Sequence, residues 1–175
     1  MKKVLNLSLL FAFVFVLASC DRVTVSSDTE KSAIIEEEKG AGEWVSSGAK
    51  YTLGNDKSVA TVKEFIEGYK NMNVETIFNL SKDSIKVFLH NMKEPMYMNR
   101  ALLTQMFSKY DSIQAKPVYF LPYQIEGWNH SVVQVVSNEV RFLKDGTQEN
   151  ERLLEKFMIN KEGKVFTIRQ FDAAW

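Results

Sequence analysis

The hydrophobic pattern of this 175-residue chain changes from a mainly helical period to a strand period near residue 117, and that change limits the folds available to it. Between residues 59 and 72, apolar residues recur every three or four positions, which predicts an amphipathic helix. Two more helices are expected, a short one after the candidate N-cap Asn73 and one from Leu103 to Ile113. From Pro117 onward the apolar residues alternate with polar ones, which predicts strands. Helices followed by an antiparallel meander indicate an α+β domain with helices against one sheet face.

The predicted strands are joined by recognisable turns. Asp145-Gly146 and Glu162-Gly163 have the composition of hairpin turns. No glycine-rich loop precedes a helix, which argues against a nucleotide-binding α/β fold. A first strand is expected over residues 84–90, and the later ones over residues 117–123, 131–143, 151–160 and 164–171.

The first twenty residues have the pattern of an export signal. Lys2 and Lys3 precede an apolar run from Leu7 to Leu17, which is too short to span a hydrocarbon core ~30 Å thick. Leu17-Ala18-Ser19-Cys20 then resembles the bacterial lipoprotein signal, in which the cysteine is lipidated and becomes the new N-terminus. The resemblance implies a lipid anchor at Cys20 in the bacterial cell envelope, on the inner or outer membrane, with the protein periplasmic or surface-exposed. A cleaved signal with an incidental thiol is the alternative.

Charge and composition exclude several classes of function. The 22 basic residues balance 22 acidic ones, and cleavage before Cys20 removes Lys2 and Lys3, so the mature chain carries a net charge of −2. No basic excess supports binding to nucleic acid. A single cysteine forms no internal disulfide, and the two histidines lack the spacing of a zinc site. We expect no metal and no cofactor.

The sequence divides into three parts. Residues 1–19 are the predicted lipoprotein signal peptide, residues 20–57 the lipidated cysteine and a flexible tether, and residues 58–175 the folded domain. The tether is rich in Ser, Thr, Glu, Lys and Gly and keeps no regular hydrophobic period. Trp44 and Tyr51 leave a second possibility open, in which this stretch packs on the domain edge as a short strand.

The order of elements and several motifs resemble the nuclear transport factor 2-like (NTF2-like) superfamily, which includes ketosteroid isomerases and SnoaL-like polyketide cyclases. The motifs are Asn73-Val74-Glu75 after the first helix, residues 81–87 leading into the first strand, and residues 160–165 at the last hairpin. The resemblance covers residues 58–172. It implies a cone in which three N-terminal helices pack on a strongly curved, mostly antiparallel sheet, with an apolar pocket open at one end. It also implies a homodimer through the sheet.

The candidate pocket residues combine a few polar groups with large aromatic side chains. Tyr69 either resembles the tyrosine on the first helix of the isomerases or fills the core. Glu139 and Arg141 share one strand face and either point into a pocket or form an exposed pair. No catalytic residue is assigned, because the strand over residues 84–90 lacks a carboxylate where the resemblance implies a catalytic acid. The residues expected to line the pocket are Tyr69, Phe88, His90, Phe107, Trp128 and Arg141.

These features predict a membrane-anchored extracytoplasmic protein whose domain binds a small apolar ligand or a protein partner without catalysis. Two alternatives stay open. One is a SnoaL-like isomerase, cyclase or hydratase that uses a pocket carboxylate with Tyr69. The other is a structural or assembly subunit of an envelope complex.

Overall fold

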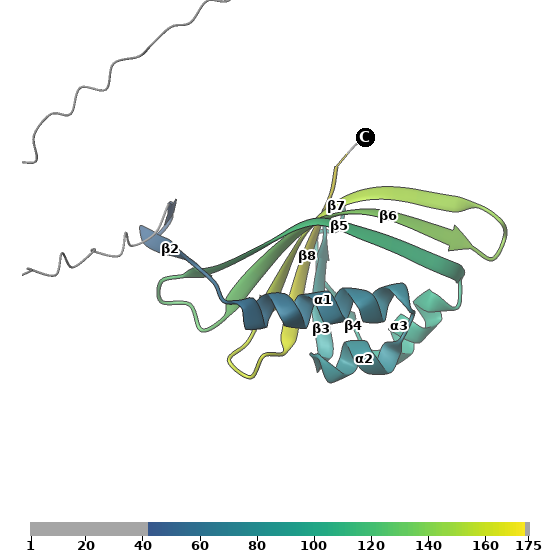
Figure 1. Ribbon diagram of the computed structural model, residues 1–175, viewed down its shortest axis with the longest axis horizontal. Coiled ribbons are helices and arrows are strands. Elements are labelled where there is room, and N and C mark those ends of the chain that lie inside the picture. Colours follow the sequence, from purple (N-terminus) through teal and green to yellow (C-terminus); the bar gives the residue numbers. More distant parts are fainter. Residues whose placement is uncertain (1–41, 174–175) are drawn as a thin grey trace, which may run out of the picture. The chain divides into compact units, whose positions relative to one another are not determined.

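The computed structural model describes residues 42–173, in which three helices lie on one side of an eight-stranded sheet (Figure 1). The helices are α1 (Asp56–Lys70), α2 (Val74–Asn79) and α3 (Arg100–Phe107). The strands are β1 (Glu43–Trp44), β2 (Ala49–Leu53), β3 (Ser81–Leu89), β4 (Met96–Met98), β5 (Tyr110–Ile125), β6 (Ser131–Leu143), β7 (Gln148–Ile159) and β8 (Val165–Ala173). No helix within residues 42–173 is long and apolar enough to cross a membrane.

The sheet has the strand order β1-β2-β5-β6-β7-β8-β3-β4. Every neighbouring pair is antiparallel except β3 and β8, which run parallel. The long strands β5, β6 and β7 arch over α1, and α2 and α3 lie on the same side of the sheet (Figure 1). The predicted α+β class, with three helices on a mostly antiparallel sheet, is confirmed.

Helix α1 places the apolar face of the first helix on the concave side of the sheet. The side chain of Asn55 caps its N-terminus by accepting a hydrogen bond from the backbone N–H of Ser58 at 3.0 Å. Val62 and Phe65 are buried, and the Phe65 ring packs edge-on against Phe157 of β7 with centroids 5.5 Å apart. This packing fixes the distance between α1 and the sheet.

Asn73 caps α2 as the sequence predicts, since its side chain accepts a hydrogen bond from the backbone N–H of Thr76 at 3.0 Å.

The close contact between α1 and α2 depends on Gly68. A Cβ atom at this position would lie only 3.0 Å from the side chain of Thr76 and 3.2 Å from that of Ile77. An alanine here would require the side chains of Thr76 and Ile77 to shift by a few tenths of an ångström.

The predicted third helix is too long. Helix α3 ends at Phe107, and β5 begins at Tyr110, so Ile113 lies in a strand rather than in the last turn of a helix. Tyr110 is paired with Leu143 of β6, and Ile113 with Arg141. The backbone hydrogen bonds of this long β5–β6 ladder outweigh a local pattern that fits either element.

Residues 43–53, which the sequence leaves open between tether and strand, form β1 and β2. Strand β2 pairs with the end of β5, and the ring of Tyr51 packs on that of Tyr123 at 5.5 Å. Trp44 packs on Trp128 with centroids 5.2 Å apart. The part of the tether nearest the domain is therefore an edge of the sheet.

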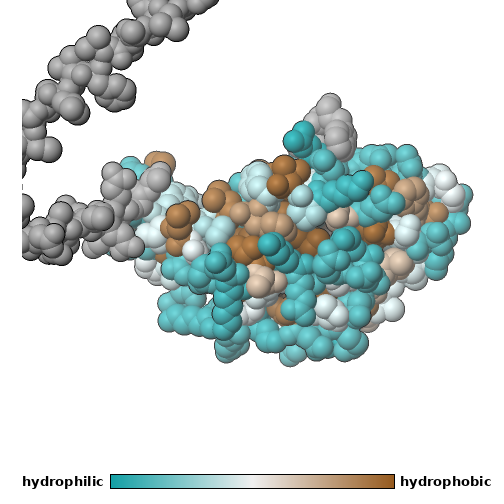
Figure 2. Space-filling view, in the orientation of Figure 1, coloured by the Kyte–Doolittle hydropathy of each residue, from teal (hydrophilic) through white to brown (hydrophobic). Residues whose placement is uncertain are grey.

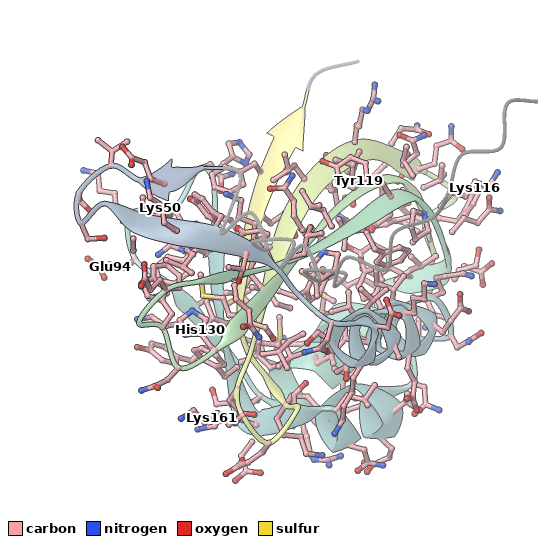
Figure 3. All side chains as sticks on the ribbon, turned by 60° about the vertical axis from the view of Figure 1, so that its left-hand side comes forward. Lys50, Glu94, Lys116, Tyr119, His130 and Lys161 are labelled. Atoms are coloured by element: carbon pink, nitrogen blue, oxygen red, sulfur yellow. The ribbon has the colours of Figure 1, made fainter. Side chains whose placement is uncertain are left out.

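The two sides of the sheet differ in character. The concave side carries the core that the helices cover, whereas Tyr119, Leu121 and Phe171 lie on the outer side and are each at least 40% exposed. Figure 2 shows hydrophilic side chains over much of the helical side and hydrophobic ones over the strands next to α1. In Figure 3, Tyr119 is drawn well apart from His130 and Lys161. His130 and Lys161 line a pocket at the N-terminus of α1.

We expect a chain that begins at Gly54, and so lacks β1 and β2, to unfold cooperatively with a lower free energy of unfolding. The loss should be about 1–3 kcal/mol, because two aromatic pairs each contribute roughly 0.5–1.5 kcal/mol beyond area burial. Urea unfolding measures this, and Trp44→Ala separates the contribution of the Trp44 ring, which packs on both Trp128 and Tyr51. A truncated chain without a cooperative transition would contradict the view that β1 and β2 only extend the sheet.

Candidate functional site

A cavity of about 200 Å³ lies between the helices and the concave face of the sheet. Side chains from all three helices and from strands β3 to β8 line it. Most of the lining is aliphatic or aromatic, which is typical of sites for small molecules. Its apolar wall includes Ile77, Ile85, Val87, Leu103, Leu153 and Phe157.

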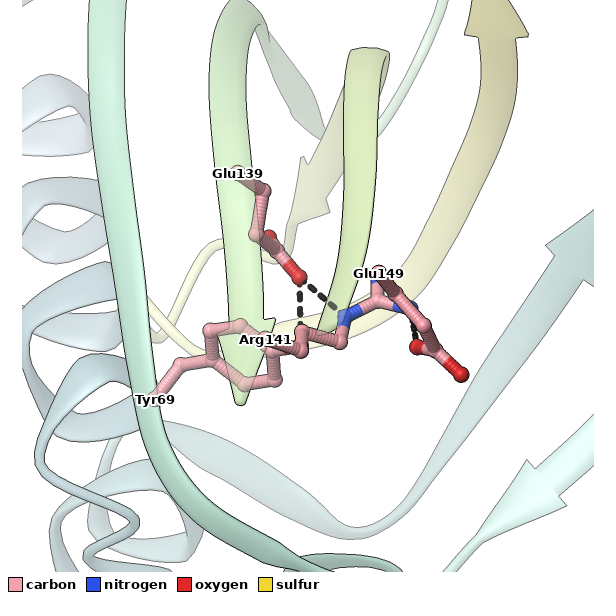
Figure 4. A network of polar contacts seen from close by, with 4 residues as sticks. All are labelled: Tyr69, Glu139, Arg141 and Glu149. Atoms are coloured by element: carbon pink, nitrogen blue, oxygen red, sulfur yellow. Dashed lines mark hydrogen bonds and ion pairs between the residues drawn. The ribbon is translucent and has the colours of Figure 1, made fainter. Parts of the chain in front are cut away.

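One wall of this cavity is polar and internally hydrogen-bonded (Figure 4). The hydroxyl of Tyr69 donates to Oε1 of Glu139 at 2.8 Å. The Nε of Arg141 donates to the same oxygen, and its Nη1 lies 3.3 Å from Oε2 of Glu149. This network joins α1 to strands β6 and β7.

The alternation of β6 places this pair inside the domain. Val133, Val135, Ser137, Glu139 and Arg141 share the concave face, and Glu139 is only 3% exposed. A buried carboxylate is costly unless it is paired and hydrogen-bonded. Of the two possibilities that the sequence left open, the structure shows the inward-facing one.

The network also determines what Tyr69 can do. Burial, followed by the negative charge of Glu139, raises the pKa of Tyr69 well above its usual value. The hydroxyl therefore stays protonated, and its single proton is directed at Glu139. Tyr69 cannot donate that proton to a bound molecule at the same time.

Glu155 is the second carboxyl group of the cavity and has a different environment. It lies on β7 between the inward-facing Leu153 and Phe157. Its side chain is partly buried and lines the cavity. Burial, followed by repulsion from Glu139, raises its pKa to about 8, although Arg141 partly opposes the shift. At neutral pH Glu155 is mainly an uncharged carboxylic acid.

The cavity continues into a polar rim. A neighbouring pocket of about 150 Å³ shares Leu89, Arg141 and Gln170 with it. There the Nδ1 of His90 lies 3.0 Å from a carboxylate oxygen of Asp172, and both side chains are partly exposed. Glu151 lines this rim pocket as well, so two carboxyl groups, of Glu151 and Asp172, lie at the edge of the cavity beside His90 and Arg141.

The structure brings together three of the six residues expected to line a pocket. Tyr69 and Arg141 line the cavity, and His90 lies at its rim. Phe107 is buried in the core and packs against the ring of Tyr69, with centroids 5.8 Å apart. It supports the cavity wall from behind.

The other two aromatic residues lie elsewhere. Phe88 faces away from the cavity on β3, where the cations of Lys86 and Arg169 lie 5.1 and 4.7 Å from its ring centre. Its neighbours Val87 and Leu89 face the cavity instead, because side chains alternate along a strand. Trp128 lines a separate polar pocket beside Lys57 and His130.

Sequence reasoning missed Glu155. The signal was present in β7, where Glu155 occupies the inward position between Leu153 and Phe157. A lone carboxyl on the apolar face of a central strand is unusual, because ionisable groups are rarely buried without a partner. The wrong start for β7, at residue 151 instead of 148, did not affect this alternation.

Comparison of the sequence with protein-family models and with curated proteins finds no match. Solved structures do match. An NTF2-like protein of unknown function from Exiguobacterium sp. has 12% sequence identity and a TM-score of 0.54, covering 66% of this chain and 99% of that one. The domain has the NTF2-like fold. The fold that the sequence motifs led us to expect is thus confirmed.

Other structures with the NTF2-like fold have varied descriptions. A ketosteroid isomerase-like protein from Erwinia carotovora atroseptica has 8% identity and a TM-score of 0.53, covering 69% of this chain and 96% of that one. An epoxide hydrolase from M. tuberculosis has 10% identity and a TM-score of 0.51, with coverage of 67% and 84%. Identities this low establish the fold alone, so function has to be argued from the cavity.

Glu155→Gln tests the environment of the cavity carboxyl. Below about pH 4.5 the Glu155 carboxyl is protonated in both the folded and the unfolded state. The variant and the wild type should then have similar free energies of unfolding. As the pH rises toward about 8, the unfolded chain loses this proton while the folded protein keeps it, and wild-type stability falls. The variant should therefore gain ~3–5 kcal/mol over wild type by about pH 8.

Urea unfolding across this pH range measures the difference. Glu64→Gln, at an exposed position of α1, is the matched control and should show no such trend. Stability curves for Glu155→Gln and wild type that stay parallel from acid to alkaline pH would contradict the assignment.

Proposed function

We propose that this protein is a membrane-anchored extracytoplasmic lipoprotein whose NTF2-like domain binds a small, largely apolar molecule without catalysis. The observation that carries the proposal is the cavity. Its apolar wall surrounds the carboxyl group of Glu155 and leaves beside it a space that no side chain of the described residues fills. A ligand that fills such a space gains apolar burial and one directed polar contact.

The cavity volume limits the size of the ligand. An engineered apolar cavity of ~150 Å³ in another protein binds benzene. A cavity of about 200 Å³ therefore suits one ring or a short alkyl chain with a single polar group. The polar group would point to Glu155, because the hydroxyl of Tyr69 and the Nε and Nη1 of Arg141 already contact Glu139 and Glu149.

The anchoring part of the proposal is supported by the lipoprotein-like segment Leu17-Ala18-Ser19-Cys20. Cys20 lies outside the described residues, as do the predicted signal peptide and most of the predicted tether. Two or more acyl chains on this cysteine would provide stable anchoring, since each buried CH₂ contributes ~0.8 kcal/mol. A cavity held near a bilayer would be well placed to take up small apolar molecules.

Catalysis is the second candidate function, and the raised pKa of Glu155 is the observation that favours it. A group that titrates near neutrality suits general acid–base chemistry. The scheme that pairs a pocket carboxylate with Tyr69 is less suitable, because the Tyr69 proton is already donated to Glu139. Turnover of a bound compound that Glu155→Gln abolishes would favour catalysis over binding.

Hexanol, a short neutral alcohol, should bind in the cavity. In a methyl NMR titration the signals of Ile85 and Leu103, which line the cavity, should shift, while those of Val136 and Leu154 on the outer face should not. Val87→Phe should weaken binding because the ring fills part of the cavity. Shifts confined to the outer face would contradict the proposal.

Cys20→Ala should abolish incorporation of labelled palmitate and release the protein from the membrane fraction. The conservative replacement of the other small residue, Ser19→Ala, should keep both, because it preserves a small side chain before the cysteine. Membrane association that persists in Cys20→Ala would overturn the anchoring part of the proposal and leave the binding part to be judged separately.

A further inference from the structure

The carboxyl of Glu155 is the one acidic group of the cavity that the polar wall leaves without a partner. Hydrogen bonds of this wall are made by Tyr69, Glu139, Arg141 and Glu149. Among the residues that the structure describes, no hydrogen bond contributes to the environment of the Glu155 carboxyl, which burial, Glu139 and Arg141 determine. Burying a polar group in an apolar cavity costs free energy unless the group forms a hydrogen bond, so a ligand that supplies this bond is favoured.

The groups that face Glu155 come from three neighbouring elements. From β6, Glu139 repels its negative charge and Arg141 attracts it. From β8, Gln170 is its register partner, which places the two side chains about 5 Å apart on the same face. From α1, Tyr69 lines the same cavity but directs its proton at Glu139.

The charge balance of this region disfavours an anionic ligand. The guanidinium of Arg141 is already bound to two carboxylates, Glu139 and Glu149. Glu151 and Asp172 add further acidic groups at the rim. An incoming carboxylate or phosphate would find no unengaged cation in the cavity lining and several like charges near it.

We propose that the cavity selects a small primary amine with an apolar body, whose ammonium group displaces the proton of the Glu155 carboxyl and forms an ion pair with the resulting carboxylate. This inference rests on the proposed function, because it names the class of ligand for the same cavity. The step is balanced: the ammonium ion and the carboxylic acid form the ion pair, and one proton leaves to the solvent. The amide oxygen of Gln170 offers a second acceptor to the ammonium group.

The exchange of a proton for an ammonium ion has a measurable signature. Near pH 7 binding of the amine should release close to one proton, because Glu155 begins protonated. Near pH 9.5 the release should approach zero, since Glu155 is then already ionised while an alkylammonium group is still largely protonated. A neutral ligand should release no proton at either pH.

Isothermal titration calorimetry on the full chain in detergent, with hexylamine, hexanol and hexanoate, tests the proposal. Titrations in buffers of different ionisation enthalpy give the number of protons released. We expect hexylamine to bind most tightly and hexanoate least tightly, with proton release only for hexylamine. Glu155→Gln should weaken hexylamine binding by about tenfold or more and abolish its proton release. Glu64→Gln, an exposed control, should change neither.

The outcomes separate this inference from the function on which it rests. Hexanol binding with equal or tighter binding of hexanoate, or hexylamine binding without proton release, would overturn the amine preference and leave the binding function intact. Absence of binding by all three compounds would overturn both. The wild-type proton count decides the question even if Glu155→Gln folds poorly.

Discussion

The buried carboxylate of Glu139 is the interaction on which the arrangement of the cavity depends. It is 3% exposed and is stabilised by the hydroxyl of Tyr69 from α1 and the guanidinium of Arg141 from its own strand. Removing either partner would leave a charge with too little compensation in a low-dielectric interior. The helix, the sheet and the orientation of two polar side chains are therefore coupled through one carboxylate.

This coupling divides the polar groups of the cavity into two sets. Tyr69, Glu139 and Arg141 bond to one another, so the Tyr69 proton and the Nε–H of Arg141 are committed to Glu139 within the wall. Glu155 has no such partner and faces apolar side chains, which keeps it uncharged at neutral pH. In this NTF2-like domain the Glu155 carboxyl lines the cavity together with the polar side chains of Ser137 and Gln170.

The sequence predicted the elements of this fold better than the faces of its strands. The apolar period of α1 and the cap at Asn73 are local signals, and both are seen in the structure. Whether Phe88 or its neighbours point inward depends on the pairing register, since a shift by one residue reverses every side chain. Ile113 was assigned to a helix because its short apolar pattern fits a helix or a strand equally well, and only pairing with β6 decides. Glu155 was missed because its burial comes from residues distant in the sequence.

The pH titration of the Glu155 side-chain carboxyl, followed by its ¹³C chemical shift and assigned with Glu155→Gln, tests the central claim most directly. Burial in an apolar cavity beside Glu139 predicts a pKa of about 8. A midpoint near the ordinary glutamate value of ~4.3 would show that water solvates the carboxyl freely. That result would contradict both the apolar character of the cavity and the division of its polar groups.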